Sequence, residues 1–170
     1  MSNPHDGRIA QLSISPGGVP KLAVPEARVT SLGLEGDAHH NTKHHGGPER
    51  AVCLFSLEAI DALAAEGHAI EPGTIGENVT VEGLDWNLVT PGARLRLGER
   101  VVLEVTRYTT PCFKIAPVFV GRDSGRVSQK QHPGWSRVYT RVLVEGPLRA
   151  GDPIHLLGER EAAEVGAARS

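Results

Sequence analysis

Apolar residues recur along this chain in short alternating or continuous runs, and turn residues separate each run from the next. Residues 7–15 alternate imperfectly and are followed by a proline and two glycines, which is typical of a strand that ends in a turn. Many such runs at regular spacing predict a mainly β fold, a barrel or closed sheet of short, mostly antiparallel strands. Strands are predicted at 7–15, 51–55, 79–81, 93–97, 101–108, 138–144 and 153–157, with 93–97 and 101–108 forming a hairpin.

Helical periodicity is confined to two segments. Ser56 is a good N-cap for a helix over Leu57–Glu66, whose apolar residues lie on one face, and Gly67 ends this helix. Phe113–Val118 predicts a short helix whose first turn holds the thiol of Cys112.

Three connecting segments also predict local structure. Residues 21–34, interrupted by Pro25, predict an extended edge segment. The dipeptide Gly146-Pro147 predicts a turn. The polar, glycine-rich stretch 121–134 predicts either a mobile flap over a site or a surface loop.

Length and charge narrow the class of protein. With 170 residues the chain suits a single domain, expected over residues 1–157, followed by a flexible C-terminal tail over 158–170 that has few apolar residues. A net charge of −2 gives no electrostatic case for a nucleic-acid or membrane partner. No apolar run approaches the roughly 18 to 20 residues that span a bilayer. With no leader segment, the expected location is the cytoplasm, where both cysteines stay reduced.

The stretch 33–52 reads G-L-E-G-D-A-H-H-N-T-K-H-H-G-G-P-E-R-A-V and is the most unusual part of the chain. It holds four of the eight histidines, next to Asp37 and several glycines. Glycine permits positive φ and close approach of the backbone to a ligand. Carboxylate and imidazole groups bind, orient or transfer protons. The stretch therefore predicts a binding loop held between strands.

The two cysteines differ in their surroundings. Cys112 follows a proline at the start of the predicted short helix, with Lys114 nearby, and such a thiol attacks electrophiles or ligates soft metals in its thiolate form. The alternative for Cys112 is a small buried hydrophobic residue. Cys53 lies inside an apolar run and is expected in the core.

The histidines leave two interpretations open. Two or three of the four, between His39 and His45, could converge with Cys112 on zinc, although their spacing matches no usual structural zinc set and no C-x-x-C pair exists. Alternatively, they hydrogen-bond to the backbone and fix the loop. A zinc hydrolase built on the His39–His45 loop is therefore the weakest of the functions considered.

Two basic residues of the same stretch point to an anion. Lys43 and Arg50 flank glycine-rich backbone, and a guanidinium suits bidentate contact with phosphate. Taken singly, each is also typical of a solvated surface charge. Together they predict a pocket for a small anion.

Six blocks, taken in order, resemble the MOSC domain, the molybdenum-cofactor sulfurase C-terminal domain, in its YiiM-like bacterial branch. The blocks are G-D-A-H-H-N-T-K-H-H-G-G-P-E-R-A-V (36–52), G-E-N-V-T-V (76–81), P-G-A-R-L-R-L-G (91–98), T-P-C-F-K (110–114), G-W-S-R-V-Y-T-R-V-L (134–143) and A-G-D-P-I (150–154). The likeness covers about residues 7 to 157, and the order of the six blocks makes it specific.

This resemblance implies a barrel-like β fold and a site for the pyranopterin molybdenum cofactor. The cysteine of the T-P-C block, here Cys112, would be the molybdenum ligand or a sulfur carrier, roles that a soft thiolate suits. Asp37 and His45 would border the pocket and relay protons. The residues expected to bind the cofactor are Lys43, Gly46, Gly47, Arg50, Glu77, Asn78, Lys114 and Arg141.

The resemblance suggests two main functions. The first is a molybdenum-cofactor reductase of N-hydroxylated compounds, such as hydroxylamines or amidoximes, that takes electrons from a separate reductase. The second is a sulfur carrier in which Cys112 accepts sulfur from a cysteine desulfurase. Pyridoxal phosphate would enter only through such a partner, because this chain lacks a desulfurase domain. The chain also stops soon after Leu157, where the YiiM branch usually continues with helices. A monomer or a homodimer is expected.

Overall fold

A computed structural model describes residues 3–38 and 47–161 of the chain. The large sheet contains β1 (Asp6–Ile14), β2 (Leu22–Val24), β5 (Val52–Ser56), β6 (Val79–Glu82), β7 (Arg94–Leu97), β8 (Val101–Tyr108), β9 (Val138–Val144) and β11 (Pro153–Leu156). A small sheet contains β3 (Glu26–Thr30), β4 (Gly33–Leu34) and β10 (Gly146–Arg149). The helices are α1 (Leu57–Ala65) and the 3₁₀ helices η1 (Pro48–Arg50), η2 (Trp86–Leu88), η3 (Phe113–Val118), η4 (Val120–Arg122) and η5 (Ser124–Val127).

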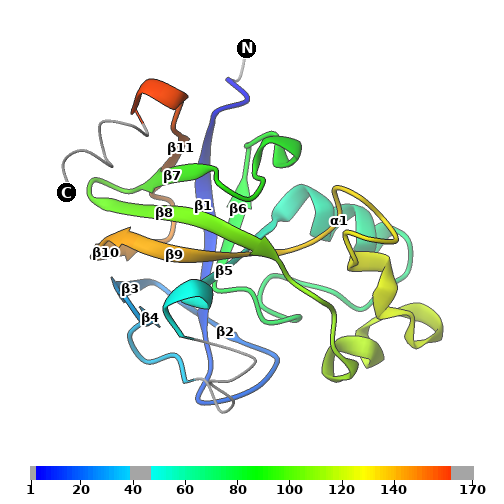
Figure 1. Cartoon of the computed structure of the whole chain (residues 1–170). Helices are drawn as coiled ribbons and strands as arrows, with labels where there is room; N and C mark the ends of the chain where they lie inside the picture. Colours follow the sequence, from blue (N-terminus) through cyan, green and yellow to red (C-terminus); the bar gives the residue numbers. More distant parts are fainter. Residues whose placement is uncertain (1–2, 39–46, 162–170) are drawn as a thin grey trace.

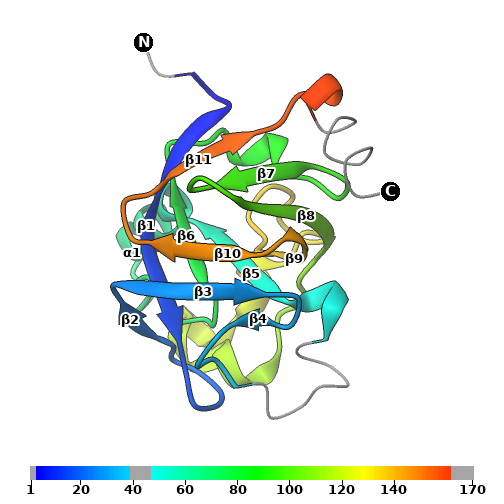
Figure 2. The ribbon, with the colours of Figure 1, turned by 90° about the vertical axis from the view of Figure 1, so that its left-hand side faces the viewer.

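The large sheet closes into a barrel, as predicted (Figure 1). Its strands run β1–β6–β5–β9–β8–β7–β11, and β11 pairs again with β1, which closes the ring. Neighbouring strands are antiparallel except for β5 and β6, which are parallel. The small sheet lies along one side of the barrel, with β3 and β10 side by side (Figure 2).

Side chains alternate between the two faces of the barrel sheet. Those on the inner face fill the barrel, and apolar side chains on the outer face contribute to a second core. On β5, Val52 and Leu54 belong to the cluster that fills the barrel, whereas Phe55 belongs to a second cluster under α1. Each fully buried aliphatic or aromatic side chain contributes roughly 2 kcal/mol to stability. The barrel interior is therefore packed with side chains, and polar chemistry has to lie on its outer wall.

The predicted long helix forms as expected. The hydroxyl of Ser56 accepts a hydrogen bond from the backbone N–H of Ala59 at 3.1 Å, which caps the first turn of α1. Ala59, Ile60 and Leu63 form its buried face. In Figure 1, α1 and the segment with η3 to η5 lie on the side of the barrel opposite the small sheet.

Three local predictions need correction. Residues 146–149 do not only turn: they form β10, which pairs with β3 because an edge strand can accommodate a proline. Cys112 precedes η3 with extended backbone angles, so its thiol does not lie in the first helical turn.

The stretch 121–134 is also more ordered than a flap or plain surface loop. It contains η4 and η5, Val127 is fully buried, and the guanidinium of Arg126 stacks on Trp135 at 4.1 Å. This segment is anchored by its own side chains.

The extended segment at 21–34 is confirmed, because β2 is an edge strand of the large sheet and β3 and β4 follow it. Part of the predicted tail, 162–170, lies outside the described residues. Glu161 accepts hydrogen bonds from the ring of His155 and from the N–H of Gly158, so the start of the predicted tail is tied to the barrel. No helix within residues 3–38 and 47–161 is long and apolar enough to cross a membrane.

Candidate functional site

Cys112 lies on the connection between β8 and η3. The N–H of Thr109 donates to the carbonyl oxygen of Arg137 at 3.0 Å, which extends the β8–β9 ladder toward the cysteine. The carbonyl of Cys112 itself accepts from the N–H of Ile115 at 3.3 Å. Its thiol is free, half-buried, and donates no hydrogen bond to any residue of the described ranges. The backbone is thus fixed while the sulfur stays available.

Tyr139 contacts Arg50 and interacts electrostatically with this cysteine. The guanidinium carbon of Arg50 sits 5.7 Å from the centre of the Tyr139 ring. Burial raises the pKa of Tyr139, and Cys53 and Cys112 raise it further, while Arg137 and Arg50 lower it. Tyr139 therefore interacts electrostatically with both cysteines. We call Cys112, Arg50 and Tyr139 the Cys112 site.

Cys53 lies behind Tyr139 on the neighbouring strand. The two residues are paired across β5 and β9, and Cys53 is 5% exposed. Burial raises the pKa of its thiol to about 12, so this sulfur stays protonated at neutral pH. The prediction that Cys53 belongs to the core is confirmed.

Cys53 and the polar residues that interact with it lie on the outer wall of the barrel, beneath the surface of the molecule. We call this group the inner polar cluster, and it consists of Lys21, Asp37, Cys53, Glu77, Asn78 and Arg137.

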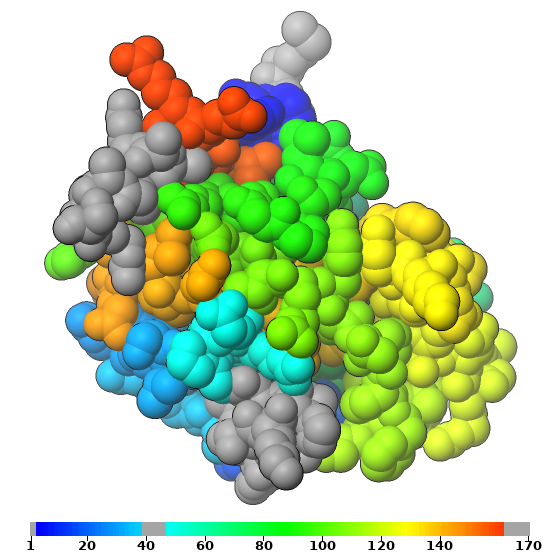
Figure 3. All heavy atoms as spheres, viewed as in Figure 1, coloured from blue at the N-terminus to red at the C-terminus, as the bar shows by residue number. Residues whose placement is uncertain are grey.

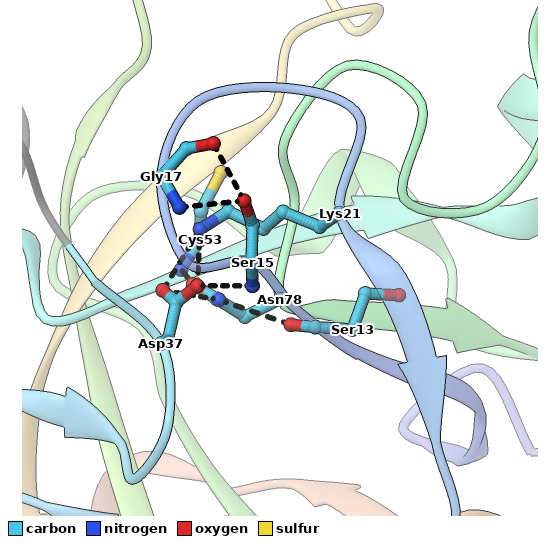
Figure 4. Close-up of polar contacts among 7 residues, drawn as sticks. All are labelled: Ser13, Ser15, Gly17, Lys21, Asp37, Cys53 and Asn78. Carbon is cyan, nitrogen blue, oxygen red and sulfur yellow. Dashed lines mark hydrogen bonds and ion pairs between the residues drawn. The ribbon is translucent and has the colours of Figure 1, made fainter.

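Asp37 is the most heavily bonded carboxylate of this cluster (Figure 4). Its side chain is 1% exposed and accepts from Lys21 Nζ at 2.6 and 2.8 Å, from the N–H of Ser15 at 2.9 Å, and from Asn78 Nδ2 at 3.0 Å. These contacts join the segment after β4 to the ends of β1 and β2. The geometry gives Asp37 a positioning role at the entrance of the histidine-rich stretch.

Asn78 ties three segments together. Its Oδ1 accepts from the N–H of Cys53 at 3.0 Å, and its Nδ2 donates to the carbonyl of Ser13 at 3.2 Å as well as to Asp37. It is 2% exposed, and these hydrogen bonds hold the wall together.

Glu77 and Arg137 are both buried. The charge of Arg137 lowers the pKa of the Glu77 carboxyl, but no ion pair joins the two side chains. Glu77 is 0% exposed, and burial raises the pKa of its carboxyl above the ordinary value despite hydrogen bonds that lower it. Among the residues that the structure describes, neither its Oε1 nor Arg137 Nε has a hydrogen-bond partner. Arg137 NH1 donates to the carbonyl of Ile75 at 2.7 Å. Glu77 therefore lies beneath the surface.

Two other predicted cofactor ligands lie at the surface. Arg141 is exposed and pairs with Glu104 at 2.5 Å and Glu49 at 3.1 Å. Lys114 is exposed, one residue beyond Phe113, and makes no hydrogen bond or ion pair within the described residues. Arg141 would have to leave its carboxylate partners to bind a phosphate.

Much of the histidine-rich stretch cannot be placed. Lys43, His45 and Gly46, together with the other histidines of the zinc hypothesis, lie outside the described residues. Gly47 is described and has a φ of 84°, which favours glycine, at the start of η1. Among the residues that are described, no three His, Cys, Asp or Glu side chains gather in a way that could hold a metal.

Tyr139 and Arg137 were not among the residues predicted from the sequence. A signal for both was present, because alternation along β9 and the residue before it puts Arg137, Tyr139 and Arg141 on one face, opposite the apolar Val138 and Val142. Of these three residues, only Arg141 was predicted to bind the cofactor. Only the pairing of β9 with β5 shows that Tyr139 is the residue next to a cysteine.

With this geometry in place, comparisons identify the family. The model of the MOSC domain matches residues 41–155, more than half of the chain. This chain belongs to the MOSC domain family. The mainly β barrel that the resemblance implied is confirmed, and Cys112 follows its strand β8.

Three relatives illustrate the likeness. YflK of Bacillus subtilis (strain 168) is 34% identical over 129 residues, which are 75% of this chain and 57% of that protein. YiiM of Escherichia coli (strain K12) is 32% identical over 148 residues, 84% of this chain and 64% of YiiM. The crystal structure of YiiM from Escherichia coli matches with a TM-score of 0.64 and 26% identity, over 92% of this chain and 76% of that one. A protein named reductase from Gibberella moniliformis (strain M3125 / FGSC 7600) is 32% identical over 133 residues, 75% of this chain and 23% of that protein. This chain thus spans less than two thirds of the length of each curated relative.

Proposed function

We propose that this MOSC domain binds the molybdenum cofactor through Cys112 and reduces N-hydroxylated compounds. Membership of the family and a longer relative that is named reductase support the class of reaction. The observation that carries the proposal is the Cys112 thiol itself, which is free, half-buried, and interacts electrostatically with Tyr139, the residue that Arg50 covers.

The residues present suit the cofactor. A thiolate is a soft donor of the kind that binds metals in sulfur-rich environments. Arg50 brings a guanidinium to the same wall, and its planar fork suits the phosphate of the cofactor. The cofactor, when bound, would supply the two electrons of the reduction.

The chain's own contribution includes a proton. Reduction of an N–OH group to N–H releases water and consumes two protons along with two electrons. Because burial raises its pKa, the Tyr139 hydroxyl keeps its proton at neutral pH, and it makes no hydrogen bond within the described residues. Tyr139 is thus suited to hold one of these protons beside Cys112. The buried ion pair of Asp37 and Lys21 would hold the loop that borders the site.

Metal analysis of matched variants tests the proposal. The protein would be produced in a host that makes the cofactor, purified without oxygen, and analysed for molybdenum and zinc. We expect molybdenum stoichiometric with the wild-type chain, lost in Cys112→Ala and kept in Cys53→Ala. Hydroxylamine or amidoxime reduction driven by a reduced viologen should follow the molybdenum content. Metal-free wild-type protein, or molybdenum retained in Cys112→Ala, would contradict the proposal, and zinc without molybdenum would support a hydrolase built on the histidines.

The same free thiol favours a second candidate, a sulfur carrier. Here Cys112 would take a sulfur atom from the persulfide of a cysteine desulfurase, whose own thiol is released, and pyridoxal phosphate would stay with that partner. Mass spectrometry after incubation with desulfurase and cysteine should show one added sulfur on Cys112. An unmodified Cys112 in metal-free protein would exclude this candidate.

A further inference from the structure

A hollow of the molecule shares no lining residue with the Cys112 site. It has a volume of about 180 Å³ and is bounded by η2, the end of β8 and the turn that precedes β9. Figure 3 shows η2 (green) and residues 129–134 (yellow) on the same face of the molecule. No residue of the Cys112 site or of the inner polar cluster lines this hollow, which we call the η2 pocket. Its main lining residues are Trp86, Asn87, Val89, Tyr108, Gln129 and Pro133.

Some polar groups of the η2 pocket already make hydrogen bonds within the protein, and others can bond to a ligand. Trp86 Nε1 donates to the carbonyl of Ser136 at 3.0 Å, which fixes the indole as a wall. Gln129 Oε1 accepts from the N–H of Gly134 at 2.9 Å, which fixes the amide and leaves its Nε2 to donate elsewhere. The hydroxyl of Tyr108 and the side-chain amide of Asn87 make no hydrogen bond within the described residues. Three available polar groups therefore share one small hollow.

The composition of the pocket restricts the charge and shape of a ligand. None of its lining residues is Asp, Glu, Lys, Arg or His, so a charged ligand would lose water without gaining a counterion. The rings of Trp86 and Tyr108 provide flat apolar surfaces. An apolar cavity of about 150 Å³ holds a benzene molecule, so a hollow of about 180 Å³ suits one ring with a small substituent.

We propose that the η2 pocket binds a neutral, single-ring carboxamide or a compound with the same carbonyl and NH₂ edge. Its carbonyl oxygen accepts from Gln129 Nε2, and its NH₂ group donates to Asn87 Oδ1 or to the Tyr108 hydroxyl. Aromatic walls with a few converging polar groups are the usual design of a small-ligand site. The proposal does not depend on molybdenum or on Cys112.

The two tryptophans of the chain give a direct test. Trp86 lines the pocket, whereas Trp135 stacks on Arg126 and does not line it. Titration of the metal-free protein with benzamide, followed through the two indole N–H signals in ¹H–¹⁵N spectra, should shift Trp86 saturably and leave Trp135 unchanged. Benzoate and benzylamine should bind at least about ten-fold more weakly, because a buried charge without a partner is costly. The absence of a saturable Trp86 shift, or equal binding of benzoate, would overturn the proposal.

A variant of nearly the same shape, Gln129→Glu, tests the proposed hydrogen bond from Gln129 Nε2 to the carbonyl oxygen of the ligand. Gln129→Glu keeps an oxygen for the N–H of Gly134 but replaces the donor with a carboxylate oxygen. It should weaken benzamide binding at least about ten-fold and improve benzylamine binding. Gln131→Glu, an exposed change of the same charge on the same segment, should leave both unchanged. Benzamide affinity that is the same in Gln129→Glu and wild type would refute the assigned contact.

Discussion

The two cysteines of this chain both raise the pKa of Tyr139, but one is buried and the other is half-exposed. Cys53 is enclosed by β5, β6 and β9 within the inner polar cluster, and burial dominates its chemistry. Cys112 sits on a connection whose backbone is fixed but whose sulfur is half-exposed. The comparison shows that the place of a cysteine in the fold, buried on a strand or half-exposed on a connection, sets the surroundings of its thiol. Four experiments test this contrast, in order of decreasing expected effect.

Thiol labelling should show the largest difference. With a pKa of about 12, Cys53 is a thiolate in only about one molecule in ten thousand at pH 8. We expect Cys112 to react with iodoacetamide at least about a thousand-fold faster than Cys53 in the folded protein. Peptide mass spectrometry over time, with Cys53→Ala and Cys112→Ala to assign each site, measures the ratio. Similar rates for both thiols under native conditions would remove the contrast.

Removing the carboxylate of the inner polar cluster should cost the most stability. Asp37→Ala leaves the ammonium of Lys21, which is 10% exposed, without its partner. We expect a loss of about 3 to 5 kcal/mol in the free energy of unfolding, measured by urea denaturation. The exposed pair of Arg149 and Glu26 provides the control, and Arg149→Ala should cost less than about 1 kcal/mol. Similar losses in both variants would show that Asp37 is not held as described.

The buried carboxyl of Glu77 should make stability depend on pH. Its pKa is raised above the ordinary 4.5 by burial. Within the window that starts at this value and extends upward, the folded chain keeps a proton that the unfolded chain has released. The free energy of unfolding therefore falls as pH rises.

Glu77→Gln should abolish this fall in the free energy of unfolding with rising pH, because an amide side chain does not titrate. Relative to wild type, the variant should gain stability as pH rises above 4.5, by at most about 1.4 kcal/mol per pH unit. Thr80→Val removes the hydroxyl that donates to Glu77 Oε2 and lowers the pKa of this carboxyl, so it should extend the decline to higher pH. Urea denaturation at several pH values measures both, and a difference that shrinks with rising pH would reverse the assigned shift.

The smallest effect is expected at Cys112. Because its side chain is half-exposed and donates no hydrogen bond within the described residues, Cys112→Ala should change the free energy of unfolding by less than about 0.5 kcal/mol. Cys53→Ser places a hydroxyl in a buried site and should cost about 1 to 3 kcal/mol. Thermal and urea unfolding compare the two. A large loss in Cys112→Ala would mean that this thiol is a packing element, and any loss of metal in that variant would then need another explanation.

Local patterns in the chain determined most of its elements. Alternation and turn residues predicted the hairpin of β7 and β8, the strands β1, β5, β6, β9 and β11, and the cap of α1 by Ser56. These features depend on neighbours within a few residues, which a sequence displays directly. The strand β10 escaped prediction because its pairing with β3 joins residues far apart in the chain.

The assignment of roles depended on contacts that no local pattern contains. The sequence indicated that Cys53 is buried and that Cys112 carries chemistry, and it marked Asp37 as unusual. Only closure of the barrel places Tyr139 against Cys53, pairs Asp37 with Lys21, and puts Glu77 below the surface. Burial and charge pairing are properties of the assembled wall, because they depend on which strands are neighbours. The order of strands in the barrel is not their order in the chain, so only the tertiary structure shows these neighbours.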